Sequence, residues 1–150
     1  MRKLVTIAAV VSVVTVTVPG LAAAADTIRA RIAGYRELGA AFKGANDGLR
    51  GDPQIVLLQQ SARQISNAAK QQYGWFPVGS GAQAGVKTAA KPGIWASPAK
   101  FKAAQDAFAR QAEQFKKATA SGNAALMRAE IRKLGATCKD CHDQFRTKDD

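Results

Sequence analysis

The chain has 150 residues, of which 47% are hydrophobic, 22% charged and only 7% aromatic, and its formal net charge is +11 at pH 7. This length accommodates one hydrophobic core and is too short for two well-packed domains. The lysines and arginines are scattered along the chain instead of being bunched, so the composition disfavours a nucleic-acid-binding protein and favours a solvated basic surface or steering toward an acidic partner.

The N-terminal segment has the composition of an export signal. Arg2 and Lys3 form a basic start, residues 4–18 form an apolar run, and Ala23 to Ala25 supply small residues for cleavage. The apolar run is shorter than the stretch of about 20 residues that a membrane span requires. We therefore expect residues 1–25 to be a cleaved signal peptide.

The mature chain would then run from Asp26 to Asp150 as a single domain. Loss of the two basic residues of the signal leaves 20 basic and 11 acidic residues, a net charge of about +9. No second apolar segment follows, so we expect an exported, soluble product with no membrane insertion and no nucleic-acid partner.

Apolar residues recur at helical spacing in four segments, and no segment alternates in the manner of a β-strand. The four apolar faces are Ile28, Ile32, Tyr35, Leu38, Gly39 and Phe42; Ile55, Leu58, Ala62, Ile65 and Ala69; Phe101, Ala104, Phe108, Ala112 and Phe115; and Met127, Ile131, Leu134, Cys138, Cys141 and Phe145.

Boundary signals separate these segments. The first helix is expected to end at Gly44, Asn46 and Gly48, and Asp52-Pro53 is expected to cap the second. Ser97-Pro98 repeats that start signal for the third helix, and residues 121–123 end it. Four amphipathic helices with mostly short connections predict an all-α fold, an antiparallel four-helix bundle.

A long connection, Gly74 to Ala96, separates the second helix from the third. Loops of more than about 12–15 residues without structure of their own are usually functional or disordered. This loop contains Trp75, Phe76 and Trp95, which argues against disorder. We expect it to fold back over an apolar feature.

The most reactive side chains lie beside the C-terminus, where Cys138, Cys141 and His142 form a C-x-x-C-H motif that holds both cysteines and the only histidine. A redox dithiol normally follows a strand, and none is predicted here. A structural zinc site needs four ligands, whereas this motif offers three. A disulfide would close a tiny loop that constrains little of the unfolded chain.

Covalent haem attachment is the fourth and favoured interpretation of the motif. Two cysteines three residues apart on a helix point to the same side, so both thiols can reach the vinyl groups along one porphyrin edge. The adjacent histidine can then give its imidazole to the iron. A large flat ligand would also supply the apolar bulk that the alanine-rich helical faces lack.

The chain resembles the class II cytochromes c, the cytochrome c′ family, over essentially the whole mature length. The haem motif stands at the C-terminal end of the bundle, which is its place in that family. The further shared features are "CKDCHDQFR", the loop stretch "WFPVGSG", the stretch "AKPGIWASPAKF" and the pattern R-x-x-x-Y-x-x-x-G from Arg31 through Tyr35 to Gly39.

This resemblance implies a periplasmic protein with one haem c per chain, bound through Cys138 and Cys141, with His142 as the proximal iron ligand. It also implies a frequent homodimer through the first two helices. The sequence leaves the oligomeric state open, because small residues such as Gly39 suit interior packing as well as helix association between chains.

Two further positions correspond to residues of the family, and two aromatic residues of the loop are expected beside the haem. Arg31 matches an arginine that approaches a haem propionate, and Arg146 matches one near the proximal imidazole. Trp75 and Phe76 are expected to cover a haem edge. Three of them have a structural alternative: Arg146 also suits a helix C-terminus, and the two aromatic residues also suit packing under the loop.

The sixth coordination position divides the family, and low-spin members carry a methionine at the place aligned with Tyr35. The mature chain has one methionine, Met127, fifteen residues before His142. At 1.5 Å per residue it lies about 22 Å away along the helix and cannot reach the iron. A neutral phenol is a poor iron ligand, so we expect Tyr35 to stand over a vacant face of a five-coordinate, high-spin iron.

The resemblance therefore implies a non-enzymatic haem protein that transfers single electrons, binds nitric oxide or carbon monoxide, or does both. A low-spin electron carrier with Tyr35 as a phenolate ligand is the alternative within the family. A haem-free helical bundle that acts as a binding module is the alternative outside it. The electron-transfer partner is expected to be a protein. An acidic partner would be attracted by the basic surface of this chain.

Overall fold

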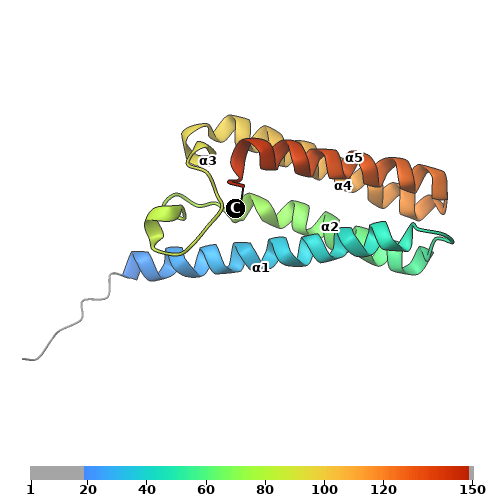
Figure 1. The fold of residues 1–150 in the computed structure, drawn as a ribbon, viewed down its shortest axis with the longest axis horizontal. Helices are drawn as coiled ribbons and strands as arrows, with labels where there is room; N and C mark the ends of the chain where they lie inside the picture. Colours follow the sequence, from blue (N-terminus) through green and yellow to red (C-terminus); the bar gives the residue numbers. More distant parts are fainter. Residues whose placement is uncertain (1–18, 149–150) are drawn as a thin grey trace, which may run out of the picture.

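The computed structural model describes residues 19–148, and in them the chain forms a long helical bundle with a loop region at one end (Figure 1). The helices are α1 (Pro19–Gly48), α2 (Ile55–Gln71), η1 (Gln72–Gly74), η2 (Ala82–Ala84), α3 (Gly93–Ala96), α4 (Pro98–Ser121) and α5 (Ala124–Phe145). The four long helices alternate in direction, so the predicted all-α antiparallel bundle is confirmed.

Three sides of the bundle are closed by helices whose backbones pack closely: α1 on α2, α2 on α4, and α4 on α5. Within residues 19–148, the backbones of α1 and α5 approach each other at far fewer positions. Figure 1 shows the loop region beyond one end of the bundle, where α4 begins and α5 ends. The haem motif at the end of α5 therefore lies beside both the loosely packed side and the loop.

The core away from the loop is built from small and medium side chains, with few aromatic rings. Buried alanines on α1, α2 and α4 allow the helices to approach. The largest fully buried side chains of this core are Phe115, Leu58, Ile65, Met127 and Leu134. A second, smaller cluster of Ile94, Phe101 and Phe145 lies at the loop end. The bundle thus has an aliphatic core and a separate aromatic cluster beside the haem motif.

Two predicted boundaries were wrong. Gly44 and Asn46 do not break the first helix, which continues to Gly48. A Cβ atom at Gly44 would find Ser61 on α2 at 3.7 Å, and the Asn46 amide donates to the Phe42 carbonyl at 3.0 Å. Both residues therefore lie within α1, where Gly44 faces α2 and Asn46 forms a hydrogen bond inside the helix.

The start of α2 also differs from the prediction. Asp52-Pro53 precedes the helix without capping it, because α2 begins at Ile55 and its N-cap is Gln54, which provides no side-chain hydrogen bond. The Gln54 N–H instead donates to the Gly48 carbonyl at 3.4 Å, which places Gln54 within a turn that follows α1.

The predicted limits of α4 are confirmed, although Ser97 provides no side-chain cap. Pro98 occupies the first turn of α4, and Gly122 ends that helix at a φ of 70°, a backbone conformation that glycine adopts readily. The Asn123 side chain accepts a hydrogen bond from Leu126 N at 3.0 Å and caps α5. A two-residue connection thus turns the chain directly into the haem-motif helix.

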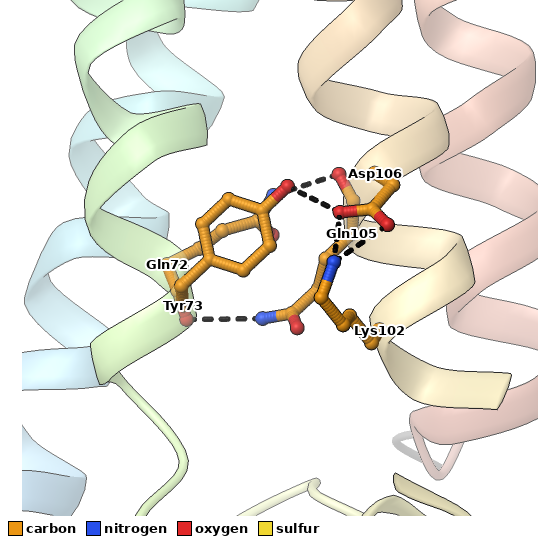
Figure 2. Close-up of polar contacts among 5 residues, drawn as sticks. All are labelled: Gln72, Tyr73, Lys102, Gln105 and Asp106. Carbon is orange, nitrogen blue, oxygen red and sulfur yellow. Dashed lines mark hydrogen bonds and ion pairs between the residues drawn. The ribbon is translucent and has the colours of Figure 1, made fainter. Parts of the chain in front are cut away.

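A polar clamp joins the end of α2 to α4 where the chain enters the loop. The side-chain amides of Gln72 and Gln105 are buried, and each donates to the main-chain carbonyl of the other, at 3.3 and 3.1 Å (Figure 2). Beside them, the Tyr73 hydroxyl donates to Asp106 at 2.7 Å, and Lys102 pairs with the same carboxylate. This clamp fixes the backbone three residues before Trp75.

The predicted signal peptide falls partly outside the described residues. Residues 19–25, which precede the expected cleavage point, form the first turns of α1, and residues 1–18 lie outside the description. In the part of the chain that is described, none of the helices combines the length and the hydrophobicity that a membrane span would require.

Candidate haem site

The two thiols and the imidazole of the C-terminal motif face different surroundings. Cys138 and Cys141 are half-buried and not joined in a disulfide; Cys138 packs against the aliphatic core and Cys141 against the aromatic cluster. His142 is exposed. The last turns of α5 therefore direct the thiols toward the interior of the bundle and leave the imidazole at its surface.

Burial keeps both thiols protonated. It raises the pKa of Cys138 to about 11, with a further contribution from the neighbouring Cys141, and it raises the pKa of Cys141 as well. Although His142 is exposed as a residue, partial burial of its imidazole lowers the pKa of His142, and the charge of Arg146 lowers it further, against the opposite effect of Asp143. The imidazole is therefore held in the neutral form that a metal ligand needs.

Tyr35 lies opposite the two thiols, on the facing side of α1. Burial raises the pKa of its phenol well above the usual range, and the two cysteines act on it electrostatically in the same direction. The ring packs edge-on against Trp75, with centroids 4.8 Å apart, and tilted against Phe76 at 6.1 Å. Tyr35 is thus a neutral phenol packed against two aromatic rings, and its role in a haem pocket stays a prediction.

An aromatic chain continues from Tyr35 across the end of the bundle. Phe76 packs edge-on against Phe101 at 4.8 Å, and Phe101 packs in the same way against Phe145 at 5.1 Å. The Trp95 indole N–H donates to the carbonyls of Phe76 and Pro77 at 3.2 and 3.1 Å. The long loop therefore folds back over apolar side chains, as expected, and joins α1, α4 and α5.

Gly34 is a site residue that the sequence analysis did not identify. A Cβ atom on Gly34 would lie 2.6 Å from the indole of Trp75, far inside van der Waals contact. The Trp75 ring therefore rests directly on the α1 backbone, one residue before Tyr35. The signal that could have revealed this was a glycine inside a helical segment, next to the candidate pocket residue.

Arg31 is buried, with 3% of its surface exposed, and its contacts are with the loop. Its two terminal nitrogens donate to the carbonyls of Trp75 and Ser80 and to the hydroxyls of Ser80 and Thr88, at 2.9 to 3.1 Å. The guanidinium also lies over the Phe76 ring, 4.6 Å from its centroid. The predicted contact of Arg31 with a haem propionate stays a prediction. The sequence analysis did not predict the contacts of Arg31 with the loop.

The same loop is tied to the end of α5. Thr147 N donates to Ala89 O at 2.8 Å and Lys91 N to Phe145 O at 2.9 Å, so that a short antiparallel pairing forms around Ala90 and Arg146. Arg146 lies one turn after His142 and is exposed, and its main-chain N–H donates to the His142 carbonyl at 3.0 Å. One loop thus contacts the helix that bears Tyr35 and the helix that bears the thiols.

Met127 lies in the first turn of α5, fully buried in the aliphatic core at the other end of that helix from His142. Its side chain is part of the packing between helices. Met127 is therefore remote from the haem motif, in agreement with the distance inferred from the sequence.

The donor set fits a covalently attached tetrapyrrole better than a metal ion held by the protein alone. Within residues 19–148, no three His, Cys, Asp or Glu side chains converge to hold a metal ion. The thiols instead point inward beside the α1–α5 side, where the helix backbones are widely spaced, with apolar side chains around them and an exposed imidazole on the next residue. Such surroundings suit a flat apolar group that is bonded at one edge and ligated from one face.

Comparison with known proteins supports the resemblance seen in the motifs. Residues 26–146 match the family model described as Cytochrome C′. The cytochrome c′ of Rhodopseudomonas palustris is 33% identical over 126 residues, which is 82% of this chain and 83% of that protein. The cytochrome c′ of Rubrivivax gelatinosus is 40% identical over 70 residues, so that match spans only 54% of its length and 47% of this chain.

Solved structures agree with the fold. The crystal structure of cytochrome c′ from Rubrivivax gelatinosus superimposes with a TM-score of 0.77 at 26% identity, over 83% of this chain and 97% of that one. Cytochrome c′ from Thermochromatium tepidum gives the same TM-score and coverage at 22% identity, a likeness of fold. The chain therefore belongs to the cytochrome c′ family, whose proteins carry covalently bound haem c.

Proposed function

We propose that this chain is a periplasmic haem protein with five-coordinate, high-spin iron that transfers single electrons, binds diatomic gases such as nitric oxide and carbon monoxide, or does both, without enzymatic turnover. Cys138 and Cys141 would form the thioether links and His142 would hold the iron. The observation that carries the proposal is that Tyr35 is the side chain of α1 that faces the two thiols, at the position where a methionine would give six-coordinate iron.

Haem would supply an iron atom that exchanges one electron and can accept a small neutral ligand. The side chains of this protein would decide which ligands can approach it. Burial favours the neutral phenol of Tyr35, which is a poor ligand, and the contacts of its ring with Trp75 and Phe76 keep the surroundings apolar. This apolar wall, formed by Tyr35, Trp75 and Phe76, favours uncharged diatomic gases over anions.

The alternative, a low-spin carrier with Tyr35 as phenolate, is disfavoured by the same surroundings. Among the groups that shift the pKa of Tyr35, only Arg31 lowers it and so favours the phenolate. Burial and the two cysteines raise that pKa. Burial is the largest of these effects. The open-site proposal therefore fits the described residues better than the low-spin alternative.

An optical spectrum distinguishes the two. We expect the ferrous protein to give a broad, unsplit visible band and a Soret peak that shifts when carbon monoxide is added. Sharp, split bands without a response to carbon monoxide would reject the open site. Tyr35→Ala should raise the carbon monoxide association rate, whereas Leu57→Ala, which shortens an exposed side chain in the first turn of α2, should leave it unchanged.

The attachment residues can be tested independently of gas binding. In cells that contain the haem-attachment machinery, the wild-type chain should gain the mass of one haem and give a pyridine haemochrome spectrum of the c type. The double variant Cys138→Ala/Cys141→Ala should carry no covalent haem. Unchanged attachment in that variant, or no added mass in the wild type, would reject the proposed links and would leave the haem-free binding module as the alternative.

The partners are proposed from charge and from relatives. The mature chain carries about nine more positive than negative charges, which favours an acidic electron-transfer partner whose association rate falls as salt increases. One structural relative, 24% identical, is described as a cytochrome c′ with ligand-controlled dimer dissociation. A homodimer is therefore a reasonable expectation for this chain, which sedimentation with and without carbon monoxide would test.

A further inference from the structure

We propose that Arg31 is a positioning residue that acts through the loop: its guanidinium fixes residues 75–88 and so holds the Trp75 indole against Gly34 and Tyr35. The part of this inference that concerns gas access rests on the proposed open iron site. The part that concerns the loop does not depend on it.

Arg31 forms hydrogen bonds with three separate residues of the loop. One terminal nitrogen donates to Trp75 O and Ser80 Oγ, both at 3.1 Å, and the other donates to Ser80 O at 3.0 Å and Thr88 Oγ1 at 2.9 Å. These bonds use the four N–H donors of the two terminal nitrogens. One side chain of α1 therefore fixes the start, the middle and the far part of the segment.

The acceptors are themselves oriented by further hydrogen bonds. Ser80 Oγ donates to Pro77 O at 2.8 Å, and Thr88 Oγ1 accepts from Ala90 N at 3.2 Å. The contact with Thr88 thus leads into the segment that pairs with the end of α5. The guanidinium forms the centre of a network that extends from α1 to the C-terminal residues.

The acceptors in this network are neutral, although the donor is a buried cation. Burial lowers the pKa of Arg31 from its usual value, and none of the hydrogen bonds made by its terminal nitrogens is to a carboxylate. A buried charge is costly unless its hydrogen-bonding groups are satisfied. The loop acceptors therefore offset the cost of burying the Arg31 charge, and Arg31 in turn holds the loop in place.

The consequence for the pocket follows from the position of Trp75. Its carbonyl is held by Arg31, its indole rests on Gly34, and its ring meets Tyr35 edge-on at 4.8 Å. The guanidinium also covers Phe76, the second ring that contacts Tyr35. Loosening of the loop would therefore release both rings that limit the movement of Tyr35.

Lysine cannot replace Arg31 in this role. The acceptors surround a planar group with two donating nitrogens, whereas an ammonium is a single donor centre on a flexible stem. Arg31→Lys should keep the charge and lose at least two of the four hydrogen bonds. That variant alone would not separate a role in the loop from a contact with a haem propionate, because it changes both.

Thr88→Val and Ser80→Ala distinguish a role in the loop from a contact with a haem propionate. Each variant removes a loop acceptor and keeps the Arg31 guanidinium. In the ferric holoprotein, hydrogen exchange measured by mass spectrometry should show faster exchange of amides in residues 75–88 for both variants. The expected increase is about tenfold or more for Arg31→Lys and smaller for the two single-acceptor variants. Arg29→Lys, on the exposed side of α1, and Ser97→Ala, whose hydroxyl caps no helix, are the matched controls and should exchange like the wild type.

The same variants should raise the carbon monoxide association rate in the same order. The inference is overturned if Thr88→Val and Ser80→Ala match the wild type in loop exchange, and equally if Arg31→Lys leaves the loop unchanged. Should Arg31→Lys fail to fold, the two single-acceptor variants still decide the matter. A wild-type protein that does not respond to carbon monoxide would reject the proposed open site, while loop exchange would still test the role of Arg31.

Discussion

At Gly34, the indole of Trp75 occupies the place where a side chain would begin. Gly34→Ala should therefore destabilise the protein by about 1–3 kcal/mol, the usual cost of an overpacked contact, although alanine is the better helix former. Chemical unfolding of the holoprotein measures the change. Gly39→Ala is the control on the same helix, since nothing lies within 4 Å of its added methyl group, and it should be neutral or stabilising by up to about 1 kcal/mol. Equal effects at the two positions would contradict the close contact.

The buried phenol of Tyr35 predicts how stability depends on pH at alkaline values. The pKa of Tyr35 is raised in the folded protein, so above the unfolded value of about 10 the unfolded chain loses this proton first. The contribution of Tyr35 to stability is thus complete below pH 10 and is lost as the pH rises above it, by at most about 1.4 kcal/mol per pH unit.

The measurement compares the free energy of unfolding of wild type and Tyr35→Phe between pH 8 and 11. The wild type should lose more stability than the variant over the alkaline part of this range. Tyr73→Phe is the comparison: burial and the nearby Asp106 also raise the pKa of Tyr73, so this variant should remove a smaller part of the same pH dependence. A wild type and Tyr35→Phe that respond identically would mean that the phenol is not buried.

Single residues were predictable where their chemistry is local. Cys138, Cys141 and His142 form a motif that can be recognised without a structure, and the distance of Met127 follows from the helical rise alone. The contact between Gly34 and Trp75 could not be foreseen, because it joins residues 41 positions apart whose approach depends on the path of the loop.

At the scale of elements, the clamp between Gln72 and Gln105 fixes the point at which α2 gives way to the loop (Figure 2). The Gln72 amide also lies 3.3 Å from the Ala69 carbonyl, a group that the end of a helix leaves without a helical partner. The clamp therefore stabilises the helix end and aligns the entry to Trp75 at once.

Gln105→Ala should lower stability by about 1–2 kcal/mol, since it leaves a buried carbonyl with one hydrogen bond fewer. Gln114→Ala, an exposed change on the same helix, should have an effect of less than about 0.5 kcal/mol. Urea unfolding followed by circular dichroism gives both values. A loss at Gln105 no larger than at Gln114 would show that the clamp adds nothing.

The four main helices were predictable because their apolar faces repeat at helical spacing, whereas two of their boundaries were not. Gly44 and Asn46 appeared to be helix breakers, yet contact with α2 and a local hydrogen bond keep them helical. Asp52-Pro53 had the sequence of a cap, but the turn after α1 displaces the helix start to Ile55. The contact with α2 thus outweighs local preference at Gly44, and a hydrogen bond of the turn does so at Asp52-Pro53.

At the scale of the molecule, the α1–α5 side brings few backbone positions together, so we expect the haem to complete the packing there. The variant Cys138→Ala/Cys141→Ala, isolated without haem, should lose stability on the order of several kcal/mol and some helical content. Wild-type chain produced without haem is the control that separates the missing group from the altered thiols. Urea midpoints of the haem-free proteins that match the holoprotein would contradict this expectation.

The bundle and its family were predictable as a whole, because the order of helices, one long loop and a C-terminal haem motif together are distinctive. The path of the loop was predictable only in outline, as a segment that covers something apolar. Its actual path depends on Arg31 and on the pairing with residues 145–147, and both are contacts between distant parts of the chain. Such contacts leave no periodic pattern in the sequence.

The pairing between the loop and the C-terminal residues has a consequence for the order of folding. Ala89 and Thr147 are 58 positions apart, and Arg31 and Thr88 are 57 apart, so these contacts close large stretches of chain and are expected to form after the helices. The wall beside Tyr35 would then be assembled last. We therefore expect the two thiols of α5 to be more accessible before that step than in the completed fold.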